Sequence, residues 1–389
     1  SSMQSGTRLA AVDLGSNSFR LEIARLELGQ LQRMEYHKET VRQGAGLDAD
    51  RCLSQDAMQR GWNCLARFAE RLAGFAPNQV RAVATQTLRE ARNREEFLTV
   101  AQQILGFPID VIAGREEARL IYQGVAHLLP QSDERRLVLD IGGRSTELII
   151  GSGYAPQVME SYRVGSVAWS MRYFPKGQFT PEAFRQADVA AKALLDEALD
   201  AYRPEQWDVA YGCSGTVAAV SDILAAAGGT PGMVTRHGLE WLVQKLLHAR
   251  TASAIDLPGI KDDRRPVIGG GVSVLRALFN MFNIQEMHVS QGALRQGVLY
   301  DLLNRQQPAT DIRSETVSRL MQKFGVDVQQ ATRVERTALM LYRQLPPGSN
   351  LPQERRERKL RWAARLHEIG THISHSSYHR HGAYILDNA

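Results

Sequence analysis

The sequence predicts an α/β protein with two related halves, followed by a helical segment. Short apolar runs that are typical of strands alternate with helical periodicity over roughly the first three quarters of the chain. That alternation indicates a mixed or parallel sheet flanked by helices. One strand–turn–strand unit also occurs twice, and its four shared positions lie 127 residues apart: Asp13 and Asp140, Gly15 and Gly142, Ser18 and Ser145, and Leu21 and Leu148. A unit reused at this domain-sized spacing predicts two halves that face one another rather than a solenoid of short repeats.

The first half continues with alternating helices and strands. Ser54 is a suitable N-cap for a helix from Gln55, and the apolar residues of that helix recur every three or four positions: Met58, Trp62, Leu65, Phe68 and Leu72. We expect these side chains in the core. Strands are predicted at 80–85 and 109–112, and helices at 90–105 and 116–129.

The second half repeats this scheme less regularly from Asp140 onward. A polar stretch with a proline at 304–312 then predicts a domain boundary, and the pattern after it is helical. We therefore assign domain I to residues 1–125, domain II to 126–308 and a helical domain to 309–389. Five of the ten histidines lie between His367 and His381, inside this helical domain.

The composition excludes several classes of protein. A chain of 389 residues with 43% hydrophobic and 23% charged residues is typical of a globular protein with an ample core. It has no apolar run long enough to span a membrane and no signal-peptide core near its N-terminus, so we expect a cytoplasmic protein. Its three cysteines form no C-x-x-C pair, which argues against both a disulfide framework and a cysteine metal site.

The basic balance comes almost entirely from arginine. The net charge of +5 rests on 40 arginines and 7 lysines. Because guanidinium binds phosphate bidentately, this excess is compatible with phosphate ligands, and codon bias explains it equally well. The densest charged run, ERRERK at 354–359, mixes both signs, so we expect no specific nucleic-acid partner.

The two repeated units indicate phosphate chemistry. A tight glycine turn at the end of a strand offers backbone amides to phosphate oxygens, and its aspartate can hold a hydrated Mg²⁺. Aspartate and glycine are also the commonest turn formers, so a single copy would be weak evidence. A third turn at 214–216 (SGT) and a predicted turn at 269–271 (GGG) strengthen the interpretation.

Two further positions are ambiguous on local grounds. Glu116 and Glu117 fall in the first helical turn after Gly114, where the helix dipole favours a carboxylate whether or not it is catalytic. Arg89, just past a predicted strand, fits a salt bridge as well as a phosphate ligand. The residues alone leave both alternatives open.

Six segments, in this order and at this spacing, resemble the exopolyphosphatase and guanosine pentaphosphate phosphohydrolase family: AVDLGSNSFRLEIARL, TQTLREARN, IAGREEARLIYQGV, LDIGGRSTELIIG, GCSGT and LRQGVLYDLL. The resemblance covers essentially the whole chain, and GWNCLARFAERLAGF and HRHGAYIL are closer to the exopolyphosphatase branch. It implies two actin-like (ribonuclease H-like) α/β domains that face one another across a cleft, followed by an all-α HD-like domain.

On the matching positions, the resemblance implies roles in phosphoanhydride hydrolysis. Glu117 would be the general base and Arg89 a phosphate ligand, while Asp140, Glu147 and Asp13 would organise Mg²⁺. The glycine turns would bind phosphate oxygens through Gly15, Ser16, Asn17, Ser18, Gly142, Gly143, Arg144, Ser145, Ser214, Gly215 and Thr216. An activating monovalent cation is a further expectation.

The resemblance also implies partners. We expect inorganic polyphosphate as the substrate, with guanosine pentaphosphate as the alternative, and a homodimer. From other classes, an actin-fold kinase or ATPase and a catalytically weak polyphosphate-binding regulator stay open. Nucleotide binding without an added acceptor would separate a kinase or ATPase from a hydrolase.

Two positions depart from the family pattern. Arg144 stands where the family usually has a third glycine, so we expect either a right-handed backbone there or an extra phosphate contact. His367 and Glu368 replace the metal-binding His-Asp pair of the HD-like domain, so we favour a structural or polyphosphate-path role for the histidine cluster over a metal site. Because longer members continue past this motif, we expect the helical domain to be truncated.

Overall fold

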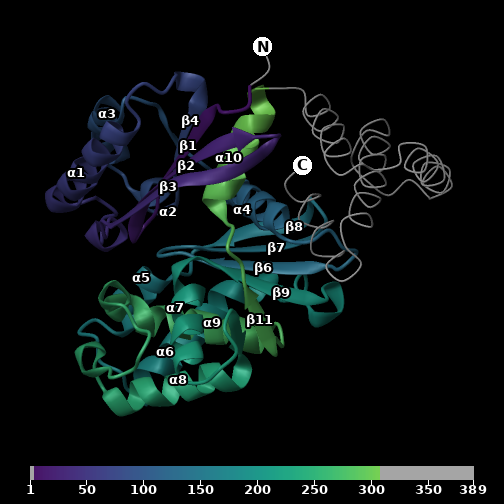
Figure 1. Cartoon of the computed structure of the whole chain (residues 1–389). Helices are drawn as coiled ribbons and strands as arrows, with labels where there is room; N and C mark the ends of the chain where they lie inside the picture. The colour runs from purple at the N-terminus through teal and green to yellow at the C-terminus, as the bar shows by residue number, and fades with distance from the viewer. Residues whose placement is uncertain (1–3, 307–389) are drawn as a thin grey trace, which may run out of the picture.

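The computed structural model describes residues 4–306, which form two lobes (Figure 1). Each lobe contains one mixed β-sheet covered by helices, so the predicted α/β class is confirmed. The predicted helical domain, its truncation and the histidine cluster lie outside the described residues. Within residues 4–306, no helix combines the length and the apolar character needed to cross a lipid bilayer.

The first lobe is a five-stranded sheet of order β3-β2-β1-β4-β5 with its helices. In chain order its elements are β1 (Arg8–Leu14), β2 (Ser18–Glu27), β3 (Gln30–Thr40), α1 (Gln55–Arg71), β4 (Val80–Ala84), α2 (Gln86–Glu90), α3 (Arg94–Leu105), β5 (Ile109–Val111) and α4 (Gly114–Leu128). The predicted cap of α1 is confirmed, because the Ser54 side chain accepts a hydrogen bond from the Ala57 amide.

The second lobe is a six-stranded sheet of order β10-β11-β9-β6-β7-β8. In chain order its elements are β6 (Arg136–Ile141), β7 (Thr146–Ser152), β8 (Ala155–Tyr162), α5 (Ser166–Tyr173), α6 (Pro181–Leu195), β9 (Val209–Cys213), α7 (Ser214–Ala226), β10 (Met233–Thr235), α8 (Arg236–Ala249), α9 (Ile268–Met281) and β11 (Glu286–Val289), followed by α10 (Leu294–Gln306). Short 3-10 turns are η1 (Gly44–Gly46), η2 (Pro77–Gln79), η3 (Asp196–Ala198), η4 (Pro204–Gln206), η5 (Ala252–Ala254) and η6 (Asp262–Val267).

The two lobes repeat one topology, as the sequence repeat indicates. In the first, β1 pairs antiparallel with β2, β2 pairs antiparallel with β3, and β1 pairs parallel with β4. In the second, β6, β7 and β8 form the same antiparallel meander, and β6 pairs parallel with β9. The aspartates of the two repeated units, Asp13 and Asp140, therefore stand at equivalent places on β1 and β6.

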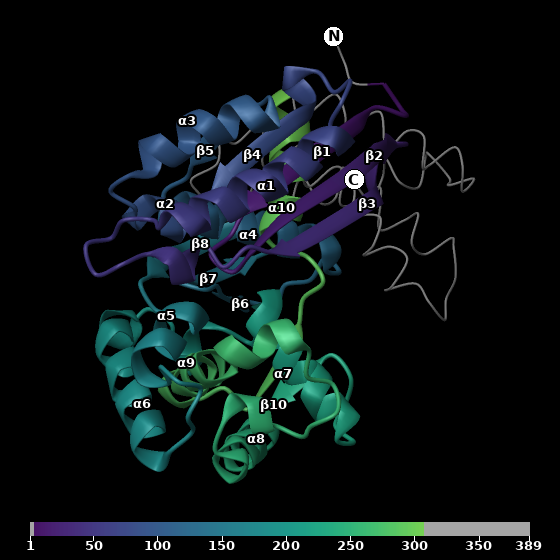
Figure 2. The ribbon, with the colours of Figure 1, turned by 90° about the vertical axis from the view of Figure 1, so that its left-hand side faces the viewer.

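Helices α4 and α10 form a layer between the two sheets (Figures 1 and 2). One buried cluster joins Leu9 and Ala11 of β1 to apolar residues of both helices and to Val138 of β6 and Ile149 of β7. The other face of β1 packs on α1 and α3, as the two-residue period of a strand requires. The predicted domain boundary at 125/126 falls inside α4, and α10 returns from the second lobe to the core of the first.

Two predicted elements differ from the structure. The helix predicted at 90–105 is present as α3, which ends at Leu105 as predicted but begins at Arg94; just before it, the Asn93 side chain bonds both the amide and the carbonyl of Leu53, at 2.8 and 3.0 Å. The turn predicted at 269–271 is the buried first turn of α9. A Cβ atom on Gly270 would lie 2.3 Å from the Ser166 carbonyl, so glycine is needed there for close packing and not for a turn.

Candidate active site

Two equivalent glycine turns face one another between the lobes. After β1, the Gly15 amide donates to the Ser18 carbonyl at 3.1 Å, and after β6 the Gly142 amide donates to the Ser145 carbonyl at 2.8 Å. The turns touch, since a Cβ atom on Gly143 would lie only 2.8 Å from the Ser16 Cβ. The repeated sequence unit thus forms a repeated structure whose two copies meet.

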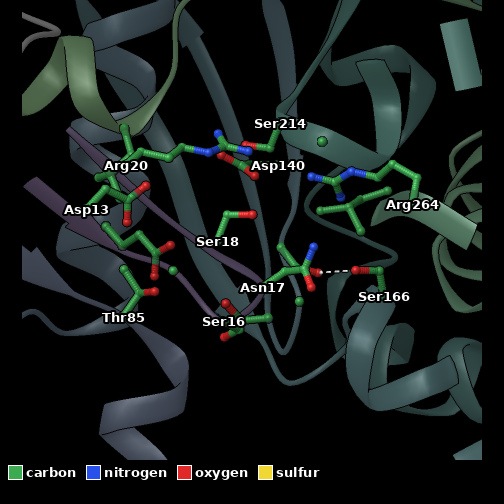
Figure 3. A pocket seen from close by; sticks show the side chains of 18 residues that line it. Asp13, Ser16, Asn17, Ser18, Arg20, Thr85, Asp140, Ser166, Ser214 and Arg264 are labelled. Carbon is green, nitrogen blue, oxygen red and sulfur yellow. Dashed lines mark hydrogen bonds between the residues drawn. The ribbon is translucent and has the colours of Figure 1, made fainter. Parts of the chain in front are cut away.

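The turns line a cavity of about 80 Å³ (Figure 3). The predicted site residues that line it are Asp13, Gly15, Ser16, Asn17, Ser18, Glu117, Asp140, Gly142, Gly143, Ser145, Ser214 and Gly215. The predicted residues that do not are Arg89, Arg144, Glu147 and Thr216. The fold therefore brings most of the predicted set together, from positions up to two hundred residues apart in the chain.

Three carboxyl groups line this cavity, from Asp13, Glu117 and Asp140, and that of Glu147 lies on the strand beside Asp140; burial raises the pKa of each of the four. Burial raises the pKa of Glu117 to about 7, against the opposing effect of the Arg89 guanidinium, and the pKa of Asp140 to about 6. Burial also raises the pKa of Asp13, and burial together with the Glu117 charge raises the pKa of Glu147 well above its usual range. The cluster therefore holds protons or attracts cations.

The cluster fits a magnesium ion that is held partly by water and substrate. The Oδ1 atom of Asp13 is buried and accepts no hydrogen bond within residues 4–306. In the same residues, no three His, Cys, Asp or Glu side chains stand close enough to enclose an ion by themselves. Mg²⁺ is usually bound by one or two carboxylates, with water and phosphate oxygens completing its shell. Asp13 and Asp140, which line the cavity, could supply those carboxylates, while Glu147 lies behind them and accepts from the Ser161 hydroxyl at 2.6 Å.

Glu117 and Arg89 form a buried ion pair. Glu117 lies in the first turn of α4, where its carboxylate lines the cavity and accepts from Arg89 Nη2 at 2.9 Å. Arg89 Nε donates to Gln86, and its Nη1 donates to the Ile112 carbonyl at 2.7 Å. All three guanidinium nitrogens therefore face the protein, and Arg89 orients Glu117 from behind rather than lining the cavity.

Arg144 points away from the cavity toward the first lobe. Its Nε donates to Glu90 at 2.9 Å, and its Nη1 donates to the Gly44 carbonyl at 3.2 Å. Its φ is not among the positive values that non-glycine residues of the described chain adopt. The turn therefore does not need a glycine at this position, and the Arg144 guanidinium bonds atoms of the first lobe.

The third predicted turn is the N-terminus of α7. Ser214 has a φ of +73°, which is unusual for a residue with a side chain, and its hydroxyl donates to Asp140, which lowers the pKa of that carboxyl. This conformation directs the first amides of α7 toward the cavity, where a helix N-terminus favours an anion. Gly215 lies against the Arg264 guanidinium, and a Cβ atom built on it would lie 2.0 Å from Arg264 Nη2, so a larger residue there would displace that guanidinium. The Thr216 side chain does not line the cavity and packs against Gly271 of α9 instead.

Sequence reasoning missed the cations of the site. Arg20 and Arg264 line the cavity from opposite sides (Figure 3), and neither guanidinium forms a hydrogen bond or an ion pair within residues 4–306. Arg264 is 7% exposed, and burial lowers its pKa. The register of β2 could have identified Arg20, because it lies two residues after Ser18 and so shares its face. No local pattern marks Arg264.

A second, larger cavity of about 420 Å³ adjoins the first and shares Arg20, Ser214, Gly215 and Arg264 with it. Six basic side chains line it, against one carboxylate from Asp222: Arg20, Arg33, Lys38, Lys261, Arg264 and Arg295. Such a cavity favours an extended anion over a neutral ligand.

Comparison with known proteins gives one consistent result. Residues 22–306 match the Ppx/GppA phosphatase family, and residues 312–389 match Ppx/GppA phosphatase domain III. The crystal structure of an exopolyphosphatase-like protein is similar to this chain at 26% identity and a TM-score of 0.69, covering 78% of this chain and 99% of its own. A PPX-GPPA enzyme of Aquifex aeolicus matches at 25% identity and a TM-score of 0.63, covering 76% and 99%.

An exopolyphosphatase of Cytophaga hutchinsonii has the same fold, with 23% identity, a TM-score of 0.69 and coverage of 77% of this chain and 98% of its own. The family match spans most of the chain and includes Glu117 and the second glycine turn, whereas the first glycine turn, at 15–18, precedes the matched range. The predicted actin-like fold of the two lobes is confirmed. The chain therefore belongs to the Ppx/GppA phosphatase family, whose members are hydrolases.

Proposed function

We propose that this protein is an exopolyphosphatase that removes the terminal phosphate of inorganic polyphosphate with Mg²⁺. One observation carries the proposal: the small cavity with the carboxyl cluster opens beside a larger cavity lined by six basic side chains. The small cavity is of a size for one phosphoryl group, and the basic cavity suits the phosphates that follow it in a chain. Arg20 and Arg264, shared by both, would then bridge the scissile bond.

The buried cations support an anionic ligand. A guanidinium that is buried without a partner costs free energy, and a phosphate oxygen removes that cost. Arg264 is in this position, with Arg20 raising the local positive potential further. A linear polyphosphate carries one negative charge or more per phosphate unit, and its successive units would pair with the successive guanidinium groups.

In the proposed mechanism, Glu117 takes a proton from a water molecule, and the water oxygen attacks the terminal phosphorus atom. The bond from that phosphorus to the bridging oxygen breaks, and the shortened chain leaves with the electron pair as a phosphate anion. Arg89 keeps the Glu117 carboxylate oriented toward the cavity. The turn amides, Arg20 and Arg264 bind the equatorial oxygens. A magnesium ion bound near Asp13 and Asp140 would neutralise charge on the phosphates.

The lining of the second cavity favours polyphosphate over guanosine pentaphosphate. Tyr36 is the aromatic side chain that lines it, and the guanidinium groups of Arg33 and Arg295 both lie over that ring, each 4.9 Å from its centroid. A guanine base would have to displace a guanidinium to stack there. A chain of phosphates needs no aromatic surface.

The test is Mg²⁺-dependent phosphate release from long-chain polyphosphate, guanosine pentaphosphate and ATP, measured side by side for this chain and its Glu117→Gln variant. We expect polyphosphate to be the fastest substrate and the variant to bind it without turnover. Faster release from guanosine pentaphosphate that excess polyphosphate does not inhibit would assign the chain to the alternative substrate. Release of phosphate from polyphosphate at the buffer rate would refute the proposal.

A further inference from the structure

Helix α2 contacts three separate parts of the proposed site, although it is only five residues long. Its side-chain contacts, in chain order, are Thr87 to Ser16 at 2.7 Å, Arg89 to Glu117 at 2.9 Å, and Glu90 to Arg144 at 2.9 Å. The helix therefore touches the first glycine turn, the proposed general base and the second glycine turn. Of these contacts, only the one between Glu90 and Arg144 joins the two lobes.

Arg144 is linked to the first glycine turn by a second route. Its Nη1 atom donates to the Gly44 carbonyl at 3.2 Å, and the Gly44 amide donates to the Ser16 carbonyl at 2.7 Å. The Arg144 stem also packs on Gly44, since a Cβ atom there would lie 3.1 Å from the Arg144 Cδ. Any movement of Arg144 relative to the first lobe would break contacts on both routes.

The pair between Arg144 and Glu90 has the geometry of a strong ion pair. Arg144 Nε faces one carboxylate oxygen at 2.9 Å, and its Nη2 faces the other at 3.3 Å. The two side chains are 16% and 11% exposed, so water screens them less than it screens a surface pair. With Nη1 on Gly44, each of the three guanidinium nitrogens donates to the first lobe.

We propose that Arg144 and Glu90 are a positioning pair, which fixes the second glycine turn against the first and aligns both with Glu117. The inference rests on the proposed function, because the pair acts through groups that would hold the reacting phosphate. Substrate capture would depend mainly on the adjoining basic cavity, which neither residue lines. Loss of the pair should therefore lower kcat and leave KM nearly unchanged.

The test compares Arg144→Gln, Glu90→Gln and the charge-reversed double variant with Arg144→Glu and Glu90→Arg. Each single variant should lower kcat for polyphosphate by roughly 10- to 100-fold, as expected for a displacement of about 1 Å at a reacting group, with KM changed by less than about threefold. The double variant should recover a large part of kcat. Arg135→Gln is the matched control, because Arg135 forms an equally close pair with Asp208 at the opposite end of β6 and should leave kcat unchanged.

A second measurement is independent of activity. Amide hydrogen exchange at residues 15–18 should quicken in Arg144→Gln, although the substitution is in the other lobe. Thermal unfolding of each variant identifies any variant that fails to fold. If Arg144→Gln fails to fold, Arg144→Lys takes its place; lysine keeps the charge but not the bidentate geometry, so we expect an intermediate kcat.

The outcomes are distinct. If Arg144 were a direct phosphate ligand and Glu90 its competitor, Glu90→Gln would match or exceed the wild type and Arg144→Gln would raise KM; either result overturns the positioning pair. Wild-type kcat in both single variants overturns it as well. Failure of the unmodified chain to release phosphate from polyphosphate would refute the proposed function instead, whereas the exchange measurement would still report on the pair.

Discussion

Replacing Glu117 with glutamine should make the protein more stable at alkaline pH while abolishing hydrolysis. Burial raises the pKa of Glu117 from 4.5 to about 7. Since one pH unit corresponds to about 1.4 kcal/mol, ionising this carboxyl in the folded, metal-free protein costs on the order of 3 kcal/mol more than in the unfolded chain. Glutamine has nearly the same shape, keeps an oxygen for Arg89, and carries no charge.

The sign of the effect follows from the direction of the shift. When folding raises the pKa of a carboxyl group, that group contributes its full stabilisation of the folded state at a pH below its pKa in the unfolded chain. This contribution is lost as the pH rises through its pKa in the folded protein. The difference between Glu117→Gln and the wild type should therefore be small at pH 4.5 and should grow to as much as about 3 kcal/mol at pH 8.

Urea unfolding in the presence of EDTA, at pH 4.5, 6 and 8, measures this difference. Glu70→Gln, which removes an exposed carboxylate on α1, serves as the control and should show no comparable pH dependence. The reasoning is wrong if Glu117→Gln is less stable than the wild type at pH 8, because the ion pair with Arg89 would then outweigh the burial of the charge.

Four further predictions follow from the same site and its supports. Hydrolysis should rise with pH and level off above about 7, since Glu117 must lose its proton to act as a base; a rate that falls over this range in initial-velocity measurements would exclude it. Arg264→Ala should raise KM for polyphosphate and flatten its dependence on salt, whereas an unchanged salt dependence would mean that this residue does not face the substrate. Ser214→Gly should stabilise the fold by about 1 kcal/mol, because glycine adopts a positive φ without strain, and should nevertheless lower kcat. Ser214→Ala should lower kcat without stabilising the fold, so equal stability of the two variants would show that the backbone at this position is not strained. Gly297→Ala should destabilise the protein by about 1 to 3 kcal/mol, because the new Cβ would lie 1.8 Å from the Leu120 carbonyl, and an unchanged urea midpoint would show that α4 and α10 can separate.

Local chemistry made part of this site predictable. The repeated Asp-x-Gly unit fixed the two turns, because a tight turn after a strand leaves few choices of residue and spacing. The helix at Gln55 and its core face followed from the Ser54 cap and from apolar spacing. In each case the deciding contacts lie within a few residues of one another in the chain.

The remainder depends on contacts between distant segments. Arg89 pairs with the Glu117 carboxylate and Arg144 with the Glu90 carboxylate, and no local pattern identifies these partners. The Asn93 side chain, just before α3, bonds Leu53, forty residues earlier in the chain. Arg264 reaches the cavity because η6 packs against α5 and α9, which the sequence does not reveal.

The position of α10 has a consequence for synthesis of the chain on the ribosome. The first lobe buries Leu9 and Ala11 of its central strand against a cluster that includes Leu294, Val298 and Leu302. That cluster is incomplete until Leu302 and Leu303 have been made, although most of the first lobe is encoded before residue 130. The N-terminal lobe must therefore wait, with the part of its apolar sheet face that α10 covers still exposed, while the second lobe is translated and folded. The nascent chain is open to aggregation throughout that interval.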